Sequence, residues 1–127
     1  MINLTSPSLN VLGTFLESCS TDPLTGYSRN GCCESDLKDK HRHFICAVMT
    51  QAFLDFSNLE GNDLARPNSK NNFPGLVAGD QWCLCVDRWI AAFTAKVAPP
   101  VILTSTHEQV LLFVTLAQLE ENNVQYY

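Results

Sequence analysis

The sequence has no cluster of basic residues and no long apolar segment. Its eight lysines and arginines are scattered between Arg29 and Lys96, and 13 acidic residues outweigh them to give a net charge of -5. Nucleic acids and anionic membranes bind clustered basic surfaces, so neither is an expected partner. The longest apolar runs, such as residues 44–49 and 110–114, are far shorter than the roughly 20 residues of a membrane-spanning helix. We therefore expect a small soluble protein.

The N-terminus also lacks the features of a secretory signal peptide. Residues 1–7 contain neither the basic start nor the apolar run that export requires. The expected location is therefore the cytoplasm, where thiols stay reduced unless they bind a metal or take part in redox chemistry. Because the chain contains six cysteines, the compartment decides their interpretation. In the cytoplasm disulfide bonds are the minor one.

No Cys-x-x-Cys motif is present, which weakens two further interpretations of the cysteines. Zinc knuckles need two residues between paired cysteines so that the chain can turn around the ion, and thioredoxin-type redox chemistry uses the same spacing. We therefore do not favour a metal site, and expect less than stoichiometric metal and free thiols in the purified, unfolded protein. The side chains of a suitable type for a metal are His43, Cys46, Cys83 and Cys85, with His107 as an alternative to His43.

Thiol redox chemistry, if it occurs, is expected in the first third of the chain. Cys19, Cys32 and Cys33 lie there among Ser, Thr, Asn, Pro and Gly residues, which are typical of loops. Adjacent cysteines can close only a strained ring, so Cys19 is an easier disulfide partner for either of the other two. Cys46, by contrast, lies in an apolar run, where buried cysteine is a common small hydrophobic residue.

Length and composition predict one domain over residues 1–127, with residues 1–9 as a flexible tail. The hydrophobic fraction of 46% and the charged fraction of 17% are ordinary for a compact domain. Apolar runs predict short strands at residues 44–49, 82–86 and 101–103, and a fourth is possible near Val11. The predicted fold class is α+β, with a small mixed sheet of three to four short strands, helices packed on it, and a loop-rich first third.

Capping residues mark where the predicted helices begin. Thr50 and Asp87 are suitable N-caps for the helices that follow the first two strands. Ser105 with Glu108, and Thr115 with Gln118, have the spacing of capping boxes and predict two short helices near the C-terminus.

A loop of about twenty residues after Gly61 is the strongest candidate for lining a site, because loops of this length are uncommon in compact domains and are often functional. A surface loop anchored by its own apolar residues is the structural alternative. Asp80 and Arg88 flank the second strand, and they either join a polar cluster with Asp63 or form a structural ion pair. The predicted binding pocket consists of Asn62, Asp63, Asp80, Trp82, Arg88 and His107.

His107 is the leading candidate for a catalytic base, with Cys85 or Cys83 as a nucleophile. It falls in the first turn of a predicted helix, where the helix dipole disfavours protonation. A neutral imidazole beside a thiol would form a nucleophile pair. The favoured interpretation is nevertheless structural, with His107 only part of a capped helix, since no partner can be placed from spacing alone.

A series of short motifs runs through the chain. It includes residues 19–27, 29–33, 46–50, 53–57, 61–64, 73–76, 79–85, 88–89 and 98–101. On these motifs the chain, from about Asn10 to Leu119, resembles the family catalogued as domain of unknown function 2237 and is identified as a member of it. The resemblance implies a small α+β protein and no established activity, substrate or cofactor. Departures from the family pattern occur at residues 35–37, His41, Arg66 and Lys96.

The sequence therefore favours a small-molecule or protein binding module, with a pocket between the long loop, the second strand and the helix opening at Ser105. The alternative is a thiol-based redox protein or a Cys/His metal-dependent enzyme. The binding module is favoured because no acid, base and nucleophile set has recognisable spacing. The sequence assigns no cofactor and no oligomeric state.

Overall fold

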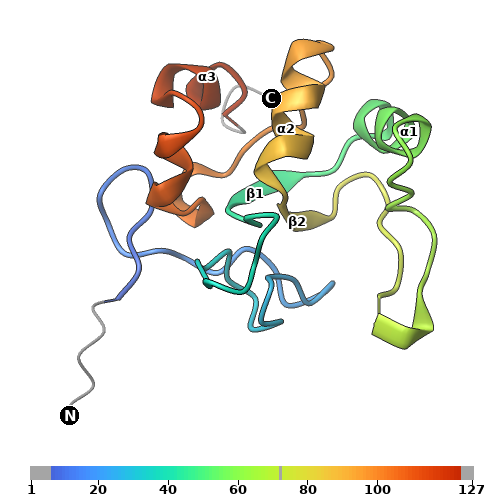
Figure 1. Cartoon of the computed structure of the whole chain (residues 1–127), viewed down its shortest axis with the longest axis horizontal. Helices are drawn as coiled ribbons and strands as arrows, with labels where there is room; N and C mark the ends of the chain where they lie inside the picture. The colour runs from blue at the N-terminus through green and yellow to red at the C-terminus, as the bar shows by residue number, and fades with distance from the viewer. Residues whose placement is uncertain (1–6, 72, 124–127) are drawn as a thin grey trace.

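The computed structural model describes residues 7–71 and 73–123. In Figure 1 the α-helices lie above a short sheet, and the loops of the first third and the loop between α1 and β2 extend below it. Of the predicted tail, residues 7–9 are described, and the Ser8 carbonyl already accepts a hydrogen bond from the Leu16 N–H (2.9 Å). The elements are β1 (Ile45–Val48), α1 (Gln51–Leu59), η1 (Ser69–Asn71), β2 (Gln81–Leu84), α2 (Val86–Thr94), η2 (Leu103–Ser105), η3 (Glu108–Leu112) and α3 (Leu116–Glu121), where η marks a 3₁₀ helix.

The fold class is mixed α+β, as predicted, but the sheet is smaller than predicted. Among the described residues it has two strands, β1 and β2, which pair antiparallel with Cys46 opposite Cys83. Val101 forms only isolated bridges, to Ala47 and to Asn123. The reason is local, because Pro99 and Pro100 have no N–H to donate to a ladder and the chain turns into η2 at Leu103. The predicted strand near Val11 is likewise reduced to isolated bridges.

Two of the four predicted helix starts are confirmed. The Thr50 hydroxyl accepts a hydrogen bond from the Phe53 N–H (3.1 Å), and Thr115 with Gln118 forms the predicted capping box of α3. Asp87 is not a cap, because β2 runs directly into α2 and Cys85 becomes the N-cap. Asp87 lies instead in the first turn of α2, where a negative charge interacts favourably with the helix dipole.

The predicted capping box at Ser105 is wrong. The Ser105 hydroxyl donates to the Ser18 carbonyl oxygen (3.0 Å), and η3 begins after His107. The His107 Nδ1 accepts the Gln109 N–H (3.1 Å), so the imidazole itself is the cap. Ser105 is instead the last residue of η2, and its hydroxyl contacts the N-terminal loop rather than the start of a helix.

Both faces of the sheet are covered. Ile45 and Ala47 of β1, with Trp82 and Leu84 of β2, belong to the main apolar core. That core includes Phe53 of α1 and Trp89 of α2, both almost fully buried. The alternate residues, Cys46 and Cys83, belong to a second buried cluster with Cys19, Cys33 and the partly buried Ile102. Side chains alternate between the faces of a strand, so the second face of the sheet is covered by cysteine.

The expectation that all six thiols stay free is wrong for four of them. Cys19 is bonded to Cys46, and Cys33 to Cys83, with Cα–Cα distances of 5.7 and 5.3 Å. Each bond ties a loop of the first third to one strand of the sheet. These loops have few regular elements of their own, so the disulfides supply covalent anchorage that the spacing of the cysteines did not reveal. Cys32 and Cys85 are free.

Candidate functional site

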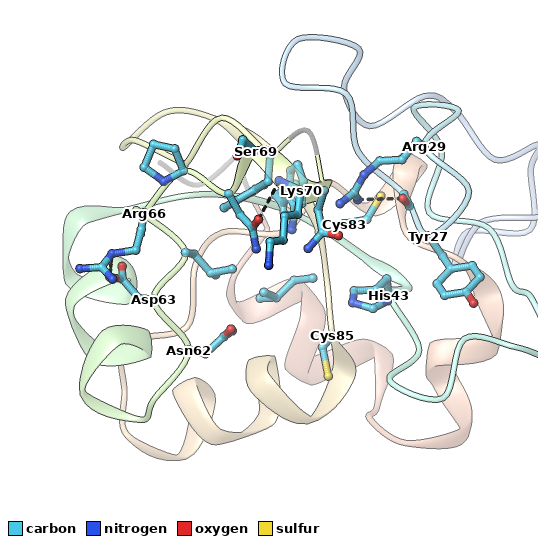
Figure 2. A pocket seen from close by; sticks show the side chains of 18 residues that line it. Tyr27, Arg29, His43, Asn62, Asp63, Arg66, Ser69, Lys70, Cys83 and Cys85 are labelled. Atoms are coloured by element: carbon cyan, nitrogen blue, oxygen red, sulfur yellow. Dashed lines mark hydrogen bonds and ion pairs between the residues drawn. The ribbon is translucent and has the colours of Figure 1, made fainter.

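A pocket of about 910 Å³ lies between the long loop and the loops of the first third, with β2 at its base. Figure 2 shows the lining side chains, which come from four separate parts of the chain, β2 and the residue after it included. The N-terminal loops contribute Tyr27 and Arg29, the segment before β1 contributes His43, and the long loop contributes most of the remaining wall. A cavity of this volume is within the range of sites for small molecules.

The long loop is held in shape by its own hydrogen bonds. Asn68 and Phe73 form an antiparallel bridge around η1, and the Leu76 N–H donates to the Leu64 carbonyl (2.8 Å) while the Leu76 side chain is buried. Gly75 makes the closest approach, since a Cβ there would lie 2.6 Å from the Ala65 carbonyl oxygen. The loop is therefore anchored by its own apolar residues and also lines the pocket.

Positive charge gathers at the pocket wall. Three of the eight lysines and arginines of the chain, Arg29, Arg66 and Lys70, line it, with Asp63 as the one carboxylate of the lining. Asp63 lies 3.8 Å from the guanidinium of Arg66, whose side chain is largely exposed. Exposed pairs of this kind contribute little to stability. The pocket thus has a formal charge of +2 in a chain whose net charge is -5.

Arg29 is held over the base of the pocket by two contacts. Its Nη1 donates to the Gly26 carbonyl oxygen (3.1 Å), and its guanidinium carbon lies 5.2 Å from the centroid of the Trp82 ring. A cation over an indole face is attracted by the ring quadrupole. Trp82 also meets Phe73 edge to face, with centroids 5.2 Å apart. The base of the pocket therefore offers apolar rings with a cation above them.

His43 enters the pocket with its ring orientation set by Asp39. Its Nδ1 lies 2.8 and 2.9 Å from the two carboxylate oxygens of the buried Asp39. Burial alone would raise the pKa of the Asp39 carboxyl, but hydrogen bonds from the backbone and ring of His43 and from the His41 backbone lower it below its ordinary value. An ionised Asp39 accepts a hydrogen bond from the Nδ1–H of His43, so Nε2 is the ring nitrogen that is left to contact a ligand.

Two of the predicted catalytic cysteines reach the pocket, but only one has a thiol. Cys83 lines the pocket and is bonded to Cys33, so it cannot act as a nucleophile. Cys85 lines the pocket as a free, partly buried thiol at the N-cap of α2. Of the predicted redox thiols, Cys19 and Cys33 are in disulfides. Burial and the nearby Glu34 carboxylate raise the pKa of the remaining one, Cys32, which lowers its thiolate fraction.

The predicted pocket residues are divided between two regions. Asn62, Asp63 and Trp82 line the pocket, whereas Asp80, Arg88 and His107 do not. The Asp80 carboxylate accepts the Val77 N–H (2.9 Å), and Arg88 reaches the Glu60 carbonyl oxygen at 3.5 Å. The predicted polar cluster of Asp63, Asp80 and Arg88 therefore does not form, because each side chain has a local partner.

His107 has a structural position. Its ring packs on Phe44 with centroids 5.4 Å apart, and 4% of the residue is exposed. Burial lowers the pKa of His107 below its ordinary value, and the Glu108 and Glu34 carboxylates oppose this effect. The sequence predicts a neutral imidazole at His107. Burial and the hydrogen bond that Nδ1 accepts from the Gln109 N–H account for that state without a ligand.

The candidate metal ligands are also separated. His43, Cys83 and Cys85 line the pocket and Cys46 does not, and Cys46 and Cys83 are bonded to Cys19 and Cys33. Sequence reasoning missed Tyr27, Arg29, Arg66, Lys70 and Asp39 as contributors to the pocket. Asp39 and His43 four residues later were a weak signal, because that spacing has structural meaning mainly in a helix and this segment is not helical.

Comparison with known proteins identifies a family but no activity. The family model described as "Uncharacterized protein conserved in bacteria (DUF2237)" matches residues 9–123. No curated protein matches the chain. Among the described residues, no helix is long and apolar enough to cross a membrane.

Proposed function

Because the chain belongs to the DUF2237 family of uncharacterized bacterial proteins, its function must be inferred from its own side chains, and we propose that it binds a small anionic organic molecule in the pocket beside β2. The observation that carries the proposal is the concentration of positive charge there. Arg29, Arg66 and Lys70 face one cavity of an acidic protein. A carboxylate or phosphate group is the chemistry that such side chains recognise.

Charge supports a ligand rather than a structural role for these cations. Arg29 is fixed by a backbone carbonyl and an aromatic ring, neither of which neutralises it. The one carboxylate of the lining, Asp63, is nearest to Arg66. A bound anion would supply the missing negative charge between Arg29 and Lys70.

The rest of the wall supports an organic molecule rather than a bare inorganic anion. Phe73 and Trp82 offer apolar rings at the base, and Tyr27 stacks near His43 with ring centroids 6.4 Å apart. The Nε2 atom of His43 adds one oriented hydrogen-bonding group. Sites of this kind combine an apolar lining with a few directed polar groups.

The test measures anion binding by wild-type protein and by Lys70→Gln, with Lys38→Gln as the matched control, because Lys38 does not line the pocket. Inorganic phosphate, succinate and benzoate serve as probes in calorimetry and thermal-shift assays. We expect the organic anions to bind and Lys70→Gln to weaken them about tenfold, since a hydrogen bond to a charged group contributes about 1.5–3 kcal/mol. Equal affinities in Lys70→Gln and Lys38→Gln would contradict the proposal.

Thiol chemistry at Cys85 is the second candidate function. The sequence offered both Cys83 and Cys85 as nucleophiles, and of these two only Cys85 is a free thiol. This function is supported by the presence of one free thiol and one oriented imidazole, His43, in the same pocket (Figure 2). Alkylation by iodoacetamide distinguishes the two functions. A nucleophile pair predicts that His43→Ala slows modification of Cys85 at neutral pH, whereas a pure binding pocket predicts no change.

A cytoplasmic location and the absence of a nucleic-acid partner stay proposals. The pocket cations form a compact group rather than the extended basic surface that nucleic acid needs. Two disulfides are unusual in a reducing compartment. The proposal of a cytoplasmic location therefore requires that the four cysteines be reduced in the cell.

A further inference from the structure

We propose that the four buried cysteines Cys19, Cys33, Cys46 and Cys83 form a tetrahedral zinc site when the chain is reduced. The Sγ atoms of Cys19, Cys33 and Cys46 all lie within 4.8 Å of one another, and Cys83 is bonded to Cys33. Two disulfides that only anchored loops to a sheet would not need to meet. Here three of the four sulfurs, both from one disulfide and one from the other, lie close enough to approach a single ion, and the fourth is bonded to Cys33. The inference is independent of the pocket and its ligand.

The sheet explains half of this convergence. Cys46 and Cys83 are direct partners across the antiparallel pair β1 and β2, and the Cβ atoms of such partners are about 4.5–5.5 Å apart on the same face. Both residues are at most 1% exposed. Side chains on one face at this Cβ separation can direct two thiolates at one metal ion, whose sulfur ligands are about 3.8 Å apart in a zinc tetrahedron with bonds of about 2.3 Å.

Hydrogen bonds that do not involve sulfur hold the backbone around the cluster. The N–H of Cys46 donates to the Thr106 hydroxyl (3.2 Å) and that of Cys83 to the Thr25 hydroxyl (2.9 Å). The Cys19 N–H donates to the Gly31 carbonyl oxygen (2.7 Å), which joins the two cysteine loops to each other. These contacts do not depend on the disulfide bonds, so they direct the four thiols at one another once the reduced chain is folded.

The chemistry of the donors favours zinc in a closed site. All four residues are at most 4% exposed, and the apolar Ile102 packs beside them. Among the described residues, the potential ligand group formed by three of them contains no His, Asp or Glu. Four sulfur ligands without an open position are typical of structural rather than catalytic zinc. This set shares Cys46 and Cys83 with the candidate ligands named from the sequence, where a metal site was not favoured, and it contains Cys19 and Cys33 in place of His43 and Cys85.

The conversion balances with a phosphine as reductant. Each disulfide accepts two electrons from one phosphine, which becomes the phosphine oxide with an oxygen from water, and two thiols result. One Zn²⁺ then displaces four thiol protons and forms four zinc–sulfur bonds. In this proposal the oxidised chain and the zinc-loaded reduced chain share one arrangement of the loops and the sheet. The redox state decides whether disulfide bonds or zinc–sulfur bonds hold that arrangement.

The test uses the full chain, reduced anaerobically with a phosphine in denaturant and returned to native buffer with Co²⁺. We expect one equivalent of Co²⁺ to bind with the absorption bands of tetrahedral thiolate coordination, and one equivalent of Zn²⁺ to displace it. Circular dichroism should show that folding of the reduced chain depends on the metal.

Two variants locate the ligands. Cys32→Ser/Cys85→Ser removes both cysteines outside the cluster and should keep the full stoichiometry, whereas Cys46→Ser should lose the tetrathiolate spectrum. If Cys46→Ser fails to fold, the first variant still decides the matter. A reduced Cys32→Ser/Cys85→Ser protein that binds less than half an equivalent of Co²⁺ would overturn the proposal, and the four cysteines would then be disulfide anchors only.

Discussion

Removing the Cys33–Cys83 bond should be among the most damaging changes to this fold under oxidising conditions. In Cys33→Ala/Cys83→Ala the unfolded chain regains the freedom of a loop closed over a separation of 50 residues. The chain-entropy relation assigns such a loop about 4 kcal/mol at 25 °C. The Cys19–Cys46 loop, with a separation of 27 residues, gives about 3.5 kcal/mol from the same relation. The first double variant should therefore lose slightly more stability than Cys19→Ala/Cys46→Ala.

Urea unfolding in non-reducing buffer measures the loss. With a slope of about 1.5–2 kcal/mol/M, the midpoint of Cys33→Ala/Cys83→Ala should fall by about 2 M or more relative to the wild type. Cys32→Ala/Cys85→Ala is the matched control, because it also removes two sulfurs but no covalent bond. Its midpoint should stay close to that of the wild type.

Alkylation of the unfolded wild-type protein without reductant gives an independent result. Two of the six cysteines, Cys32 and Cys85, should be labelled, and all six after reduction. Six labels without reduction, together with equal midpoints for the two double variants, would refute the reasoning from loop closure. That outcome would leave the zinc site as the remaining role for the cluster.

The remaining predictions concern pH and backbone geometry. Burial lowers the pKa of His107, so the unfolded chain binds a proton at this side chain more readily than the folded chain. The stability that the neutral imidazole contributes is therefore present above about pH 6.5 and is lost as the pH falls through the folded pKa. His107→Asn, which keeps a capping oxygen, should flatten that part of a plot of urea midpoint against pH, and an unchanged slope would contradict the assignment. In urea unfolding, Gly75→Ala should destabilise the protein more than Gly61→Ala. Both glycines have positive φ, but of the two only Gly75 would bring a Cβ against a backbone atom, the Ala65 carbonyl oxygen. Equal losses of stability in the two variants would mean that the long loop moves aside.

Local patterns predicted the parts of the fold that depend on neighbours in the chain. The Thr50 cap and the Thr115 capping box formed as expected, because each needs only residues within one helical turn. The predicted strand over residues 82–86 is confirmed only as far as Leu84. Within it Trp82 and Leu84 belong to the main core and Cys83 to the cysteine cluster, whereas Cys85 is the N-cap of α2 and Val86 its first residue. The third strand failed because hydrogen-bond partners across a sheet are not a local property, and Val101 met β1 for a single bridge.

The candidate site was predictable only in part. The long loop was a candidate from its length alone, and Asn62, Asp63 and Trp82 do line the pocket. Arg29 and His43 could not be assigned to it, because they come from segments whose path depends on where the first third of the chain is anchored. For His107 the sequence favoured a structural role over a catalytic one, and its buried ring contacts Phe44 and caps η3.

The sequence by itself determined the family, the α+β class, two helix starts and the alternation that puts cysteine on one face of the sheet, since these follow from residue identity and short-range geometry. Only the tertiary structure decided which cysteines meet. Cys46 and Cys83 are 37 positions apart and become cross-strand partners through β pairing, and Cys19 and Cys33 reach them from loops that have no periodic pattern. The same folding brings Arg29, His43 and Lys70 to one pocket, because convergence in space is set by packing that no single segment encodes.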